Sequence, residues 1–349
     1  MIRPFKKEYV RILGIETSCD ETAAAVVEDG QSILSNIVAS QVDLHSKYGG
    51  IFPEVASREH IRVIHPVVEQ ALNESHLSMS EIDAIAVTRG PGLVGSLVVG
   101  INFAKGAALS TGLPLLGINH LEGHLYSAWL KSSENQEYHP PQFPLLALIV
   151  SGGHTSLILM EEHLTYKRLG STLDDAAGEA FDKVARLLSL PYPGGPSIQK
   201  ASESGNPLAF NFPRAWLEGT WNFSFSGLKT AVLRTLQELH SQGKPVHTEN
   251  IAASFQAAVV DVLAKKTLLA ARHFQVKEIL VAGGVSANRA LRKAFSEQDE
   301  FKVHIPPLAL CTDNAVMISA AGFFHYKYKE KEEMDFDALP NWPLGNDIV

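Results

Sequence analysis

Short apolar runs alternate with longer stretches of helical periodicity along most of the chain. Residues 10–16 and 23–27 are apolar and flank the polar segment TSCDET, which predicts a strand, a tight turn and a second strand. Between residues 55 and 75, apolar side chains such as Val67 and Ala71 recur on one helical face. Strands that alternate with helices in this way predict an α/β fold with largely parallel central sheets.

The same patterns place the remaining elements. We expect further strands at 32–40, 82–87, 115–118, 145–150, 155–160, 278–282 and 301–304. We expect helices at 96–110, 122–130, 174–188, 226–240, 249–273, 289–296 and 312–325, and a Pro-Gly loop at 191–196.

A polar and then Pro-rich stretch at 131–144 is the best candidate for a domain boundary. The pattern of apolar strand, small polar turn, Thr and apolar strand occurs at 12–27 and again at 145–160, which indicates an internal duplication. We therefore expect an N-terminal α/β subdomain over 1–144 and a C-terminal α/β subdomain over 145–349. The last helix, about 312–330, is a candidate to pack back against the N-terminal subdomain.

Composition and charge narrow the class of protein. With 45% hydrophobic residues, the chain has enough apolar surface for two packed cores, which argues against disorder. Because the net charge is −8, any contact with RNA must be local or shared with a partner. The presence of only two cysteines indicates a reducing compartment, and no apolar run approaches the roughly 18 residues of a membrane span. We expect a cytoplasmic protein that does not associate with membranes.

The segment His120-Leu-Glu-Gly-His124 is a candidate metal-binding motif. On a helix, residues four apart lie only about 40° from each other around the axis, so both imidazoles can reach one ion. Glu122 lies about 200° around from His120 and points elsewhere, unlike the glutamate of H-E-x-x-H. Among 14 histidines such a pair also arises by chance, so the spacing leaves both interpretations open. Asp313 by itself is typical of an acidic residue at a helix N-terminus, and no spacing connects it to the histidines.

Five Gly-rich turns follow apolar strands, at 14–22, 89–95, 151–154, 193–196 and 282–288. Such turns expose backbone N–H groups on a concave face that suits phosphate oxygens, although each alone is weak evidence. Together they favour a nucleotide cleft between two domains, without a Walker or G-x-G-x-x-G pattern.

Asp174 and Asp175 open an expected helix and stabilise its dipole, whereas Asp182 is a candidate to bind a ribose hydroxyl or a metal through water. The segment FSFSGLKT at 223–230 is typical of a chain that enters the hydrophobic core and caps the N-terminus of the following helix.

Ten segments together resemble the TsaD family of bacterial tRNA adenosine threonylcarbamoyltransferases, formerly the Gcp or glycoprotease family. They are GIETSCDET (14–22), YGGIFPEVASREH (48–60), GPGLVGSL (90–97), NHLEGH (119–124), LIVSGGHT (148–155), DDAAGEAFDK (174–183), YPGGP (192–196), FSFSGLKT (223–230), GGVSAN (283–288) and CTDNA (311–315). The resemblance spans roughly residues 10–345 and leaves residues 1–10 as an extension.

The resemblance implies an actin/sugar-kinase/Hsp70-like fold, with two related α/β domains and a ligand cleft between them. The implied reaction transfers the threonylcarbamoyl group from threonylcarbamoyl-AMP to N6 of the adenosine adjacent to the anticodon, releasing AMP. The implied acceptors are tRNAs that read codons starting with A. Implied partners are the paralogue TsaB and the ATPase TsaE, with TsaC supplying the adenylate.

The resemblance also implies the site residues. One divalent metal, Fe²⁺ or Zn²⁺, would be held by His120, His124 and Asp313. The implied substrate-binding residues are Ile149, Val150, Ser151, Gly152, Gly153, Asp182, Gly195 and Asn288. Candidate catalytic residues, facing the cleft from the first hairpin, are Glu16, Ser18 and Asp20.

Two other activities compete with this interpretation. A metalloprotease needs a carboxylate base beside a metal-bound water, and Glu122 faces the wrong way on an uninterrupted helix. A sugar-kinase-like ATPase would turn over ATP in the isolated chain, and it gives the histidine pair no role. A non-catalytic scaffold would have lost the ligand residues, and all of them are present.

Overall fold

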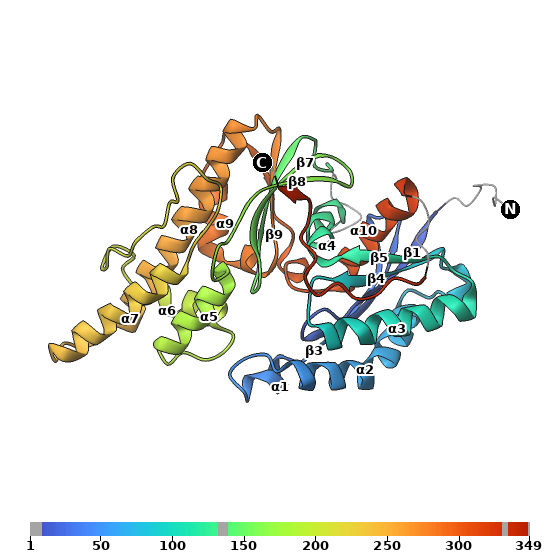
Figure 1. Ribbon diagram of the computed structural model, residues 1–349, viewed down its shortest axis with the longest axis horizontal. Coiled ribbons are helices and arrows are strands. Elements are labelled where there is room, and N and C mark those ends of the chain that lie inside the picture. Colours follow the sequence, from blue (N-terminus) through green and yellow to red (C-terminus); the bar gives the residue numbers. More distant parts are fainter. Residues whose placement is uncertain (1–8, 132–138, 330–333, 348–349) are drawn as a thin grey trace. The chain divides into compact units, whose positions relative to one another are not determined.

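The computed structural model describes residues 9–131, 139–329 and 334–347, and it divides into two compact units (Figure 1). Unit 1 comprises Met1–Pro140 and Thr312–Leu344, and unit 2 comprises Pro141–Cys311 and Gly345–Val349. Half of the stretch expected to separate the domains, residues 132–138, lies outside the described part, as do most residues of the N-terminal extension.

Unit 1 contains a five-stranded sheet in the order β3-β2-β1-β4-β5. Its strands are β1 (Arg11–Glu16), β2 (Glu21–Glu28), β3 (Ser32–Ser40), β4 (Ala84–Gly90) and β5 (Leu115–Asn119). The first three strands form an antiparallel meander, and β4 and β5 run parallel to β1. The predicted strand, turn and strand at the start of the chain are therefore confirmed.

The helices of unit 1 cover both faces of this sheet. They are α1 (Val42–Ser46), α2 (Pro53–Glu74), α3 (Val94–Thr111), α4 (His120–Tyr126) and α10 (Ala315–Tyr328). Because strand side chains alternate, Leu13 and Ile15 enter the core with α2 and α3, whereas Gly14 faces α10. A Cβ on Gly14 would lie 2.3 Å from Oγ of Ser319, so glycine permits the close approach of α10.

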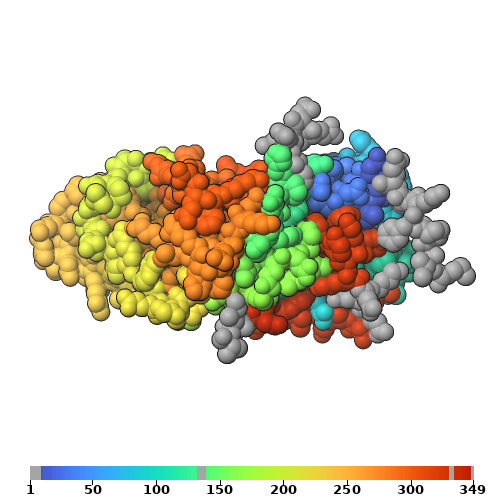
Figure 2. Space-filling model, turned by 90° about the horizontal axis from the view of Figure 1, so that it is seen from above, coloured from blue at the N-terminus to red at the C-terminus, as the bar shows by residue number. Residues whose placement is uncertain are grey.

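Unit 1 is built from both ends of the chain. Helix α10 packs on β1, β2 and α4, and in Figure 2 the red C-terminal segment lies against the blue N-terminal strands. The main-chain carbonyl of Trp342 accepts from Nδ2 of Asn119 at 3.1 Å, so residues after α10 also return to this unit.

Unit 2 repeats the strand order of unit 1. Its strands are β6 (Leu145–Val150), β7 (Thr155–Glu162), β8 (Thr165–Ser171), β9 (Glu278–Ala282), β10 (Lys302–His304) and β11 (Asn346–Asp347), in the order β10-β9-β6-β7-β8-β11. As in unit 1, three antiparallel strands come first and the next two are parallel to the first. This shared topology confirms the predicted duplication of the strand pattern.

The helices of unit 2 are α5 (Ala177–Leu187), α6 (Gly194–Ser202), α7 (Ser226–Ser241), α8 (Thr248–His273) and α9 (Arg289–Ser296). Helices α5, α7 and α8 share one core with the sheet, in which the ring of Phe181 packs edge-on to Phe255 with centroids 5.2 Å apart. Strand β8 and helix α6 were not predicted. Because α6 begins at Gly194, inside the Gly-Pro segment expected to be a loop, local composition concealed it.

Helix α3 corrects the expectation that no segment has the length and apolar character of a membrane span. Its 18 residues have a mean hydropathy of 1.2, which meets that requirement by length and composition. Leu97, Ile101 and Ala104 of this helix are buried in the core of unit 1. Burial in the core accounts for only part of its apolar character, because Val94, Val98 and Leu109 of the same helix are exposed.

Candidate functional site

Both histidines of the predicted metal motif lie on α4, immediately after β5. Asn119 caps this helix, because its Oδ1 accepts a hydrogen bond from the backbone N–H of Leu121 at 2.9 Å. Every residue of α4 is buried. Gly123 lets α10 pack closely, since a Cβ there would lie 2.7 Å from Cδ1 of Ile318.

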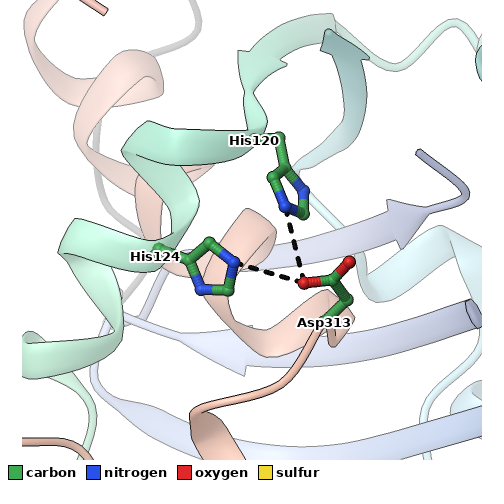
Figure 3. A group of neighbouring side chains, drawn as sticks. All are labelled: His120, His124 and Asp313. Carbon is green, nitrogen blue, oxygen red and sulfur yellow. Dashed lines mark ion pairs between the residues drawn. The ribbon is translucent and has the colours of Figure 1, made fainter. Parts of the chain in front are cut away.

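The structure brings Asp313 to the two imidazoles (Figure 3). Its Oδ1 lies 3.4 Å from Nε2 of His120 and 3.2 Å from Nε2 of His124. Asn314, rather than Asp313, caps α10, because its side chain accepts from the N–H of Met317 at 3.1 Å. Asp313 is therefore not required as a helix cap, and one ligand atom from each of the three side chains lies within 4.8 Å of the others.

The chemistry of this group fits a divalent cation. Both ring nitrogens of His124 are fully buried and make no hydrogen bond to any described residue, although Nε2 lies near Asp313. A buried polar atom without a partner is costly, and a cation between the three side chains would satisfy Nε2. Two imidazoles and one carboxylate suit Zn²⁺ or Fe²⁺ equally well, so the donor set alone does not select the metal.

Glu16 and Ser18, from the first hairpin, contact His120 on the side away from Asp313. Nδ1 of His120 lies 3.0 Å from Oε2 of Glu16 and 3.1 Å from Oγ of Ser18. Glu16 also accepts hydrogen bonds from the hydroxyl of Thr88 and the backbone N–H of Ser18. Hydrogen bonding of Nδ1–H to a carboxylate directs Nε2 towards a metal, which is the usual arrangement around metal-binding histidines.

The charges in this group support one another. Burial opposes ionisation of Glu16, but attraction to His120 and the hydrogen bonds with His120 and Thr88 together outweigh it and lower the pKa of the carboxyl. Burial likewise opposes protonation of His120, but Asp313 and Glu16 raise its pKa well above the usual value. Burial disfavours the charged form of Asp313 too, yet His120 and His124 lower its pKa. Without a metal, a protonated His120 therefore supplies the positive charge between Asp313 and Glu16.

Asp20, the third residue predicted to be catalytic, does not contact either imidazole within the described part of the chain. Its main chain holds Gln41, whose N–H donates to the carbonyl of Asp20 at 3.0 Å. The neighbouring Glu21 is partly buried, and this burial, then Asp313 and Asp20, raises the pKa of its carboxyl to about 10. This concentration of carboxyl groups around Asp313 is a further reason why a cation fits the site.

Unit 2 contains a separate pocket of about 260 Å³. Its lining residues are Gly152, Gly178, Phe181, Asp182, Pro193, Gly195, Pro196, Gln199, Gly284, Val285, Ala287 and Asn288. The pocket is therefore formed where the turn after β6, helices α5 and α6, and the turn after β9 meet.

Four of the predicted substrate-binding residues line this pocket, namely Gly152, Asp182, Gly195 and Asn288. Ile149 and Val150 lie inside β6 and are completely buried, so they support the pocket from behind. The backbone N–H of Ser151 donates to the carbonyl of His154 at 2.8 Å, within the turn. That N–H group is therefore satisfied within the turn.

The polar side chains of the pocket also hold its walls together. Oδ1 of Asp182 accepts from the N–H of Gly194 at 2.7 Å. Oδ1 of Asn288 caps α9 through the N–H of Leu291, and its Nδ2 donates to Oε1 of Gln256 at 2.8 Å. Gln256 was not predicted, because a glutamine inside the long α8 carries no local signal.

Gly178 is a second residue that the sequence analysis did not assign to the site. A Cβ there would lie 2.6 Å from the carbonyl oxygen of Ser151, and its N–H donates to that carbonyl at 3.1 Å. The first turn of α5 thus packs directly on the turn after β6. The signal for this contact was available, since Gly178 shares a helical face with Asp182.

Asp174 was predicted to open α5, and this is wrong, because that helix begins at Ala177. Its carboxylate instead accepts hydrogen bonds from the hydroxyls of Ser224 and Ser226 and from the N–H groups of Phe225 and Ser226. These donors form the start of α7, where the helix dipole favours a negative charge. The FSFSG segment therefore binds an acidic side chain of the same unit, consistent with its predicted structural role.

Comparison with known proteins identifies relatives of nearly the same length. The family model described as "TsaD: tRNA N6-adenosine threonylcarbamoyltransferase" matches residues 32–320. Proteins named tRNA N6-adenosine threonylcarbamoyltransferase from Dehalococcoides mccartyi (strain CBDB1) and Geobacillus thermodenitrificans are each 53% identical, covering 95% and 97% of this chain and 98% of each relative. The protein of that name from Bacillus subtilis is 50% identical over 95% of both chains.

Solved structures support the fold at much lower sequence identity. HypF of T. kodakarensis aligns with a TM-score of 0.61 and 16% identity, covering 93% of this chain and 48% of HypF. Component A of the (R)-2-hydroxyglutaryl-CoA dehydratase from Acidaminococcus fermentans aligns with a TM-score of 0.52 and 15% identity, covering 92% and 100%. The fold is the predicted actin/sugar-kinase/Hsp70-like one.

Proposed function

Because the chain belongs to the TsaD family of tRNA N6-adenosine threonylcarbamoyltransferases, we propose that it transfers a threonylcarbamoyl group from threonylcarbamoyl-AMP to tRNA. The acceptor is N6 of the adenosine adjacent to the anticodon, in tRNAs that read codons starting with A. The observation that carries this proposal is the convergence of His120, His124 and Asp313 in a chain that matches its relatives over nearly their whole length.

The transfer reaction has a weak nucleophile, the N6 amine, and a charged leaving group, AMP. N6 of adenosine attacks the carbonyl carbon of the carbamoyl group, the C–O bond to phosphate breaks, and AMP leaves with the electron pair while N6 loses a proton. The adenylate is a mixed anhydride and is already activated, whereas the amine is a weak nucleophile because its lone pair is delocalised into the ring. The target lies in a single-stranded loop, so presenting it costs less than flipping a base from a duplex.

The residues of unit 1 would bind the metal and orient its ligands. His120, His124 and Asp313 would bind one divalent ion, Fe²⁺ or Zn²⁺, which when bound acts as a template and Lewis acid for the donor group. Glu16 accepts a hydrogen bond from Nδ1–H of His120, which keeps Nε2 directed at Asp313. Ser18 contributes a hydroxyl to the same nitrogen, so both residues act through His120.

The pocket of unit 2 suits the adenylate part of the donor. The backbone N–H groups of Gly152 and Gly153 would bind the phosphate and stabilise the leaving AMP. Asp182 offers a carboxylate for ribose hydroxyls, and Asn288 forms the wall beside the nucleoside. Ile149, Val150 and Ser151 support this turn, and Gly195 leaves room above it.

A net charge of −8 agrees with an RNA surface that is shared with other proteins. The partners we propose are TsaB and TsaE, with TsaC supplying the adenylate, in the cytoplasm. The protease alternative is disfavoured because the carboxylate of Glu122 pairs with His325 and is not placed beside the His120–His124 pair.

The test is transfer from synthetic threonylcarbamoyl-AMP to purified tRNA by the protein reconstituted with its partners. His120→Ala and His124→Ala should abolish transfer, whereas the exposed His65→Ala should retain it. Unchanged turnover by a metal-stripped His120→Ala protein would remove the metal from the mechanism. Fast ATP hydrolysis by the isolated chain would instead favour the kinase-like alternative.

A further inference from the structure

A buried acid–histidine pair connects the helix of the metal-binding histidines to α10. Oε2 of Glu122 lies 2.7 Å from Nε2 of His325, and their side chains are only 3% and 5% exposed. Glu122 lies between His120 and His124 in sequence but on another side of α4, and no step of the proposed reaction uses it. His325 lies in the last turn of α10.

The same two helices are in close contact elsewhere. Gly123 packs on Ile318, and the ring of Tyr126 stacks on Phe324 with centroids 4.5 Å apart. Asp313 lies two residues before α10 begins. Helix α4 therefore makes polar contacts with residues near both ends of α10, at Asp313 through its histidines and at His325 through Glu122.

This arrangement couples the rotation of α4 to the geometry of the metal group. At about 100° per residue, Glu122 lies roughly 200° around the axis from His120. A turn of α4 that separates Glu122 from His325 must also move the imidazoles relative to Asp313. Because a buried carboxylate without its partner is strongly unfavourable, the pair opposes that turn.

We propose that Glu122 and His325 are positioning residues, which hold α4 at the rotation that directs both imidazoles to the metal. The proposal rests on the metal site in the proposed function. It does not require either residue to touch the metal or the substrates. It assigns a role to the glutamate of the HLEGH motif that differs from the catalytic glutamate of a metalloprotease.

The test measures binding of Co²⁺ alone to the metal-free full-length chain, by chelator competition and by the visible absorption of the bound ion. Glu122→Gln keeps the size of the side chain and removes its charge. The matched control is Glu278→Gln, because Glu278 pairs with His304 in unit 2 at the same 2.7 Å and is also largely buried. Outer partners of metal ligands typically contribute about 10–100-fold to affinity.

We expect Glu122→Gln to weaken Co²⁺ binding about 10-fold, the low end of this range because Glu122 acts one contact further from the metal, and to change the absorption spectrum, with Glu278→Gln close to wild type. Adding His325→Gln should restore part of the affinity, because two amides form a neutral hydrogen-bonded pair. Should Glu122→Gln fail to fold, Glu122→Asp tests the same contact with a shorter acid.

Wild-type affinity and spectrum in the folded Glu122 variant would overturn the inference, as would equal weakening by Glu278→Gln. Failure of the metal site itself would look different. In that case the wild-type chain would bind Co²⁺ no better than His120→Ala.

Discussion

Nδ1 of His120 lies 3.0 Å from Oε2 of Glu16, and this contact joins the end of β1 to the start of α4. Glu16 is completely buried, and its carboxylate also accepts hydrogen bonds from the N–H of Ser18 in the local turn and from the hydroxyl of Thr88 on β4. The residue predicted to be catalytic from the first hairpin is thus placed to orient a metal ligand. If His120 binds the proposed metal, this geometry makes Glu16 a positioning residue.

Glu16→Gln should lower metal affinity and transfer about 10–100-fold without removing any proposed ligand. The amide is a weaker acceptor for Nδ1–H and no longer attracts a cation near His120. Metal content after dialysis against a chelator measures the effect, with circular dichroism to confirm folding. Glu28→Gln is the control, because Glu28 forms an ion pair with Arg11 at 3.0 Å, away from α4. Retention of metal equal to that of the control would contradict the assigned role.

Lys266→Met should destabilise the protein by about 2–4 kcal/mol. Lys266 is only 1% exposed, and its ammonium group donates to the backbone carbonyls of Trp216, Thr220 and Asn222. Methionine keeps the volume but leaves these carbonyls without their donor. Urea denaturation measures the change, and the exposed Lys265→Met on the same helix should be nearly neutral.

The same lysine predicts a pH dependence of stability. Burial lowers the pKa of Lys266 to about 8, from 10.5 in the unfolded chain. Between these values the unfolded chain holds a proton that the folded chain has released, so stability rises with pH. The difference in unfolding free energy between wild type and Lys266→Met should therefore grow from about pH 8 to pH 10.5 and be constant below pH 8. A gap that narrows over this range would show that the folded-state pKa is not lowered.

Two neighbouring glycines should respond differently to alanine. In Gly194→Ala the new Cβ would lie 2.5 Å from Cα of Asp182, so the pocket wall must shift and stability should fall by about 1–3 kcal/mol. Gly195→Ala meets no atom within 4 Å, so stability should be unchanged, although its methyl group enters the pocket. Thermal unfolding together with calorimetric titration of AMP separates the two effects. Equal melting temperatures for both variants would argue against the close contact at Gly194.

Asp174→Asn should lower stability by about 1 kcal/mol, as for the loss of a helix cap. Burial opposes ionisation, but the hydrogen bonds from Ser224, Phe225 and Ser226 together outweigh it and lower the pKa of Asp174. A carboxyl with a lowered pKa stabilises the fold above its unfolded value, and this contribution is lost as the pH falls. The difference from wild type should therefore shrink in acid, as measured by denaturation at pH 7 and below pH 4. Asp43→Asn on the short α1 is a surface control.

Much of the secondary structure was predictable because it depends on neighbours in sequence. Strand β9 and helix α9 have the predicted bounds, 278–282 and 289–296. Their apolar periodicity and flanking turns are local signals. The start of α5 was predicted three residues too early, because Asp174 had a distant partner, Ser226, that no local pattern could reveal.

The sequence by itself determined the α/β alternation, the repeated hairpin and the four-residue spacing that puts His120 and His124 on one face of a helix, although the helix was predicted to begin at residue 122 and begins at His120. These follow from periodicities of two and about 3.6 residues, which act over a few neighbouring positions. Only the tertiary structure decided which residues meet those imidazoles, namely Asp313 from just before α10 and Glu16 from the end of β1. That convergence depends on α10 packing against β1 through Gly14 and Ser319, a contact between distant parts of the chain that local spacing does not encode.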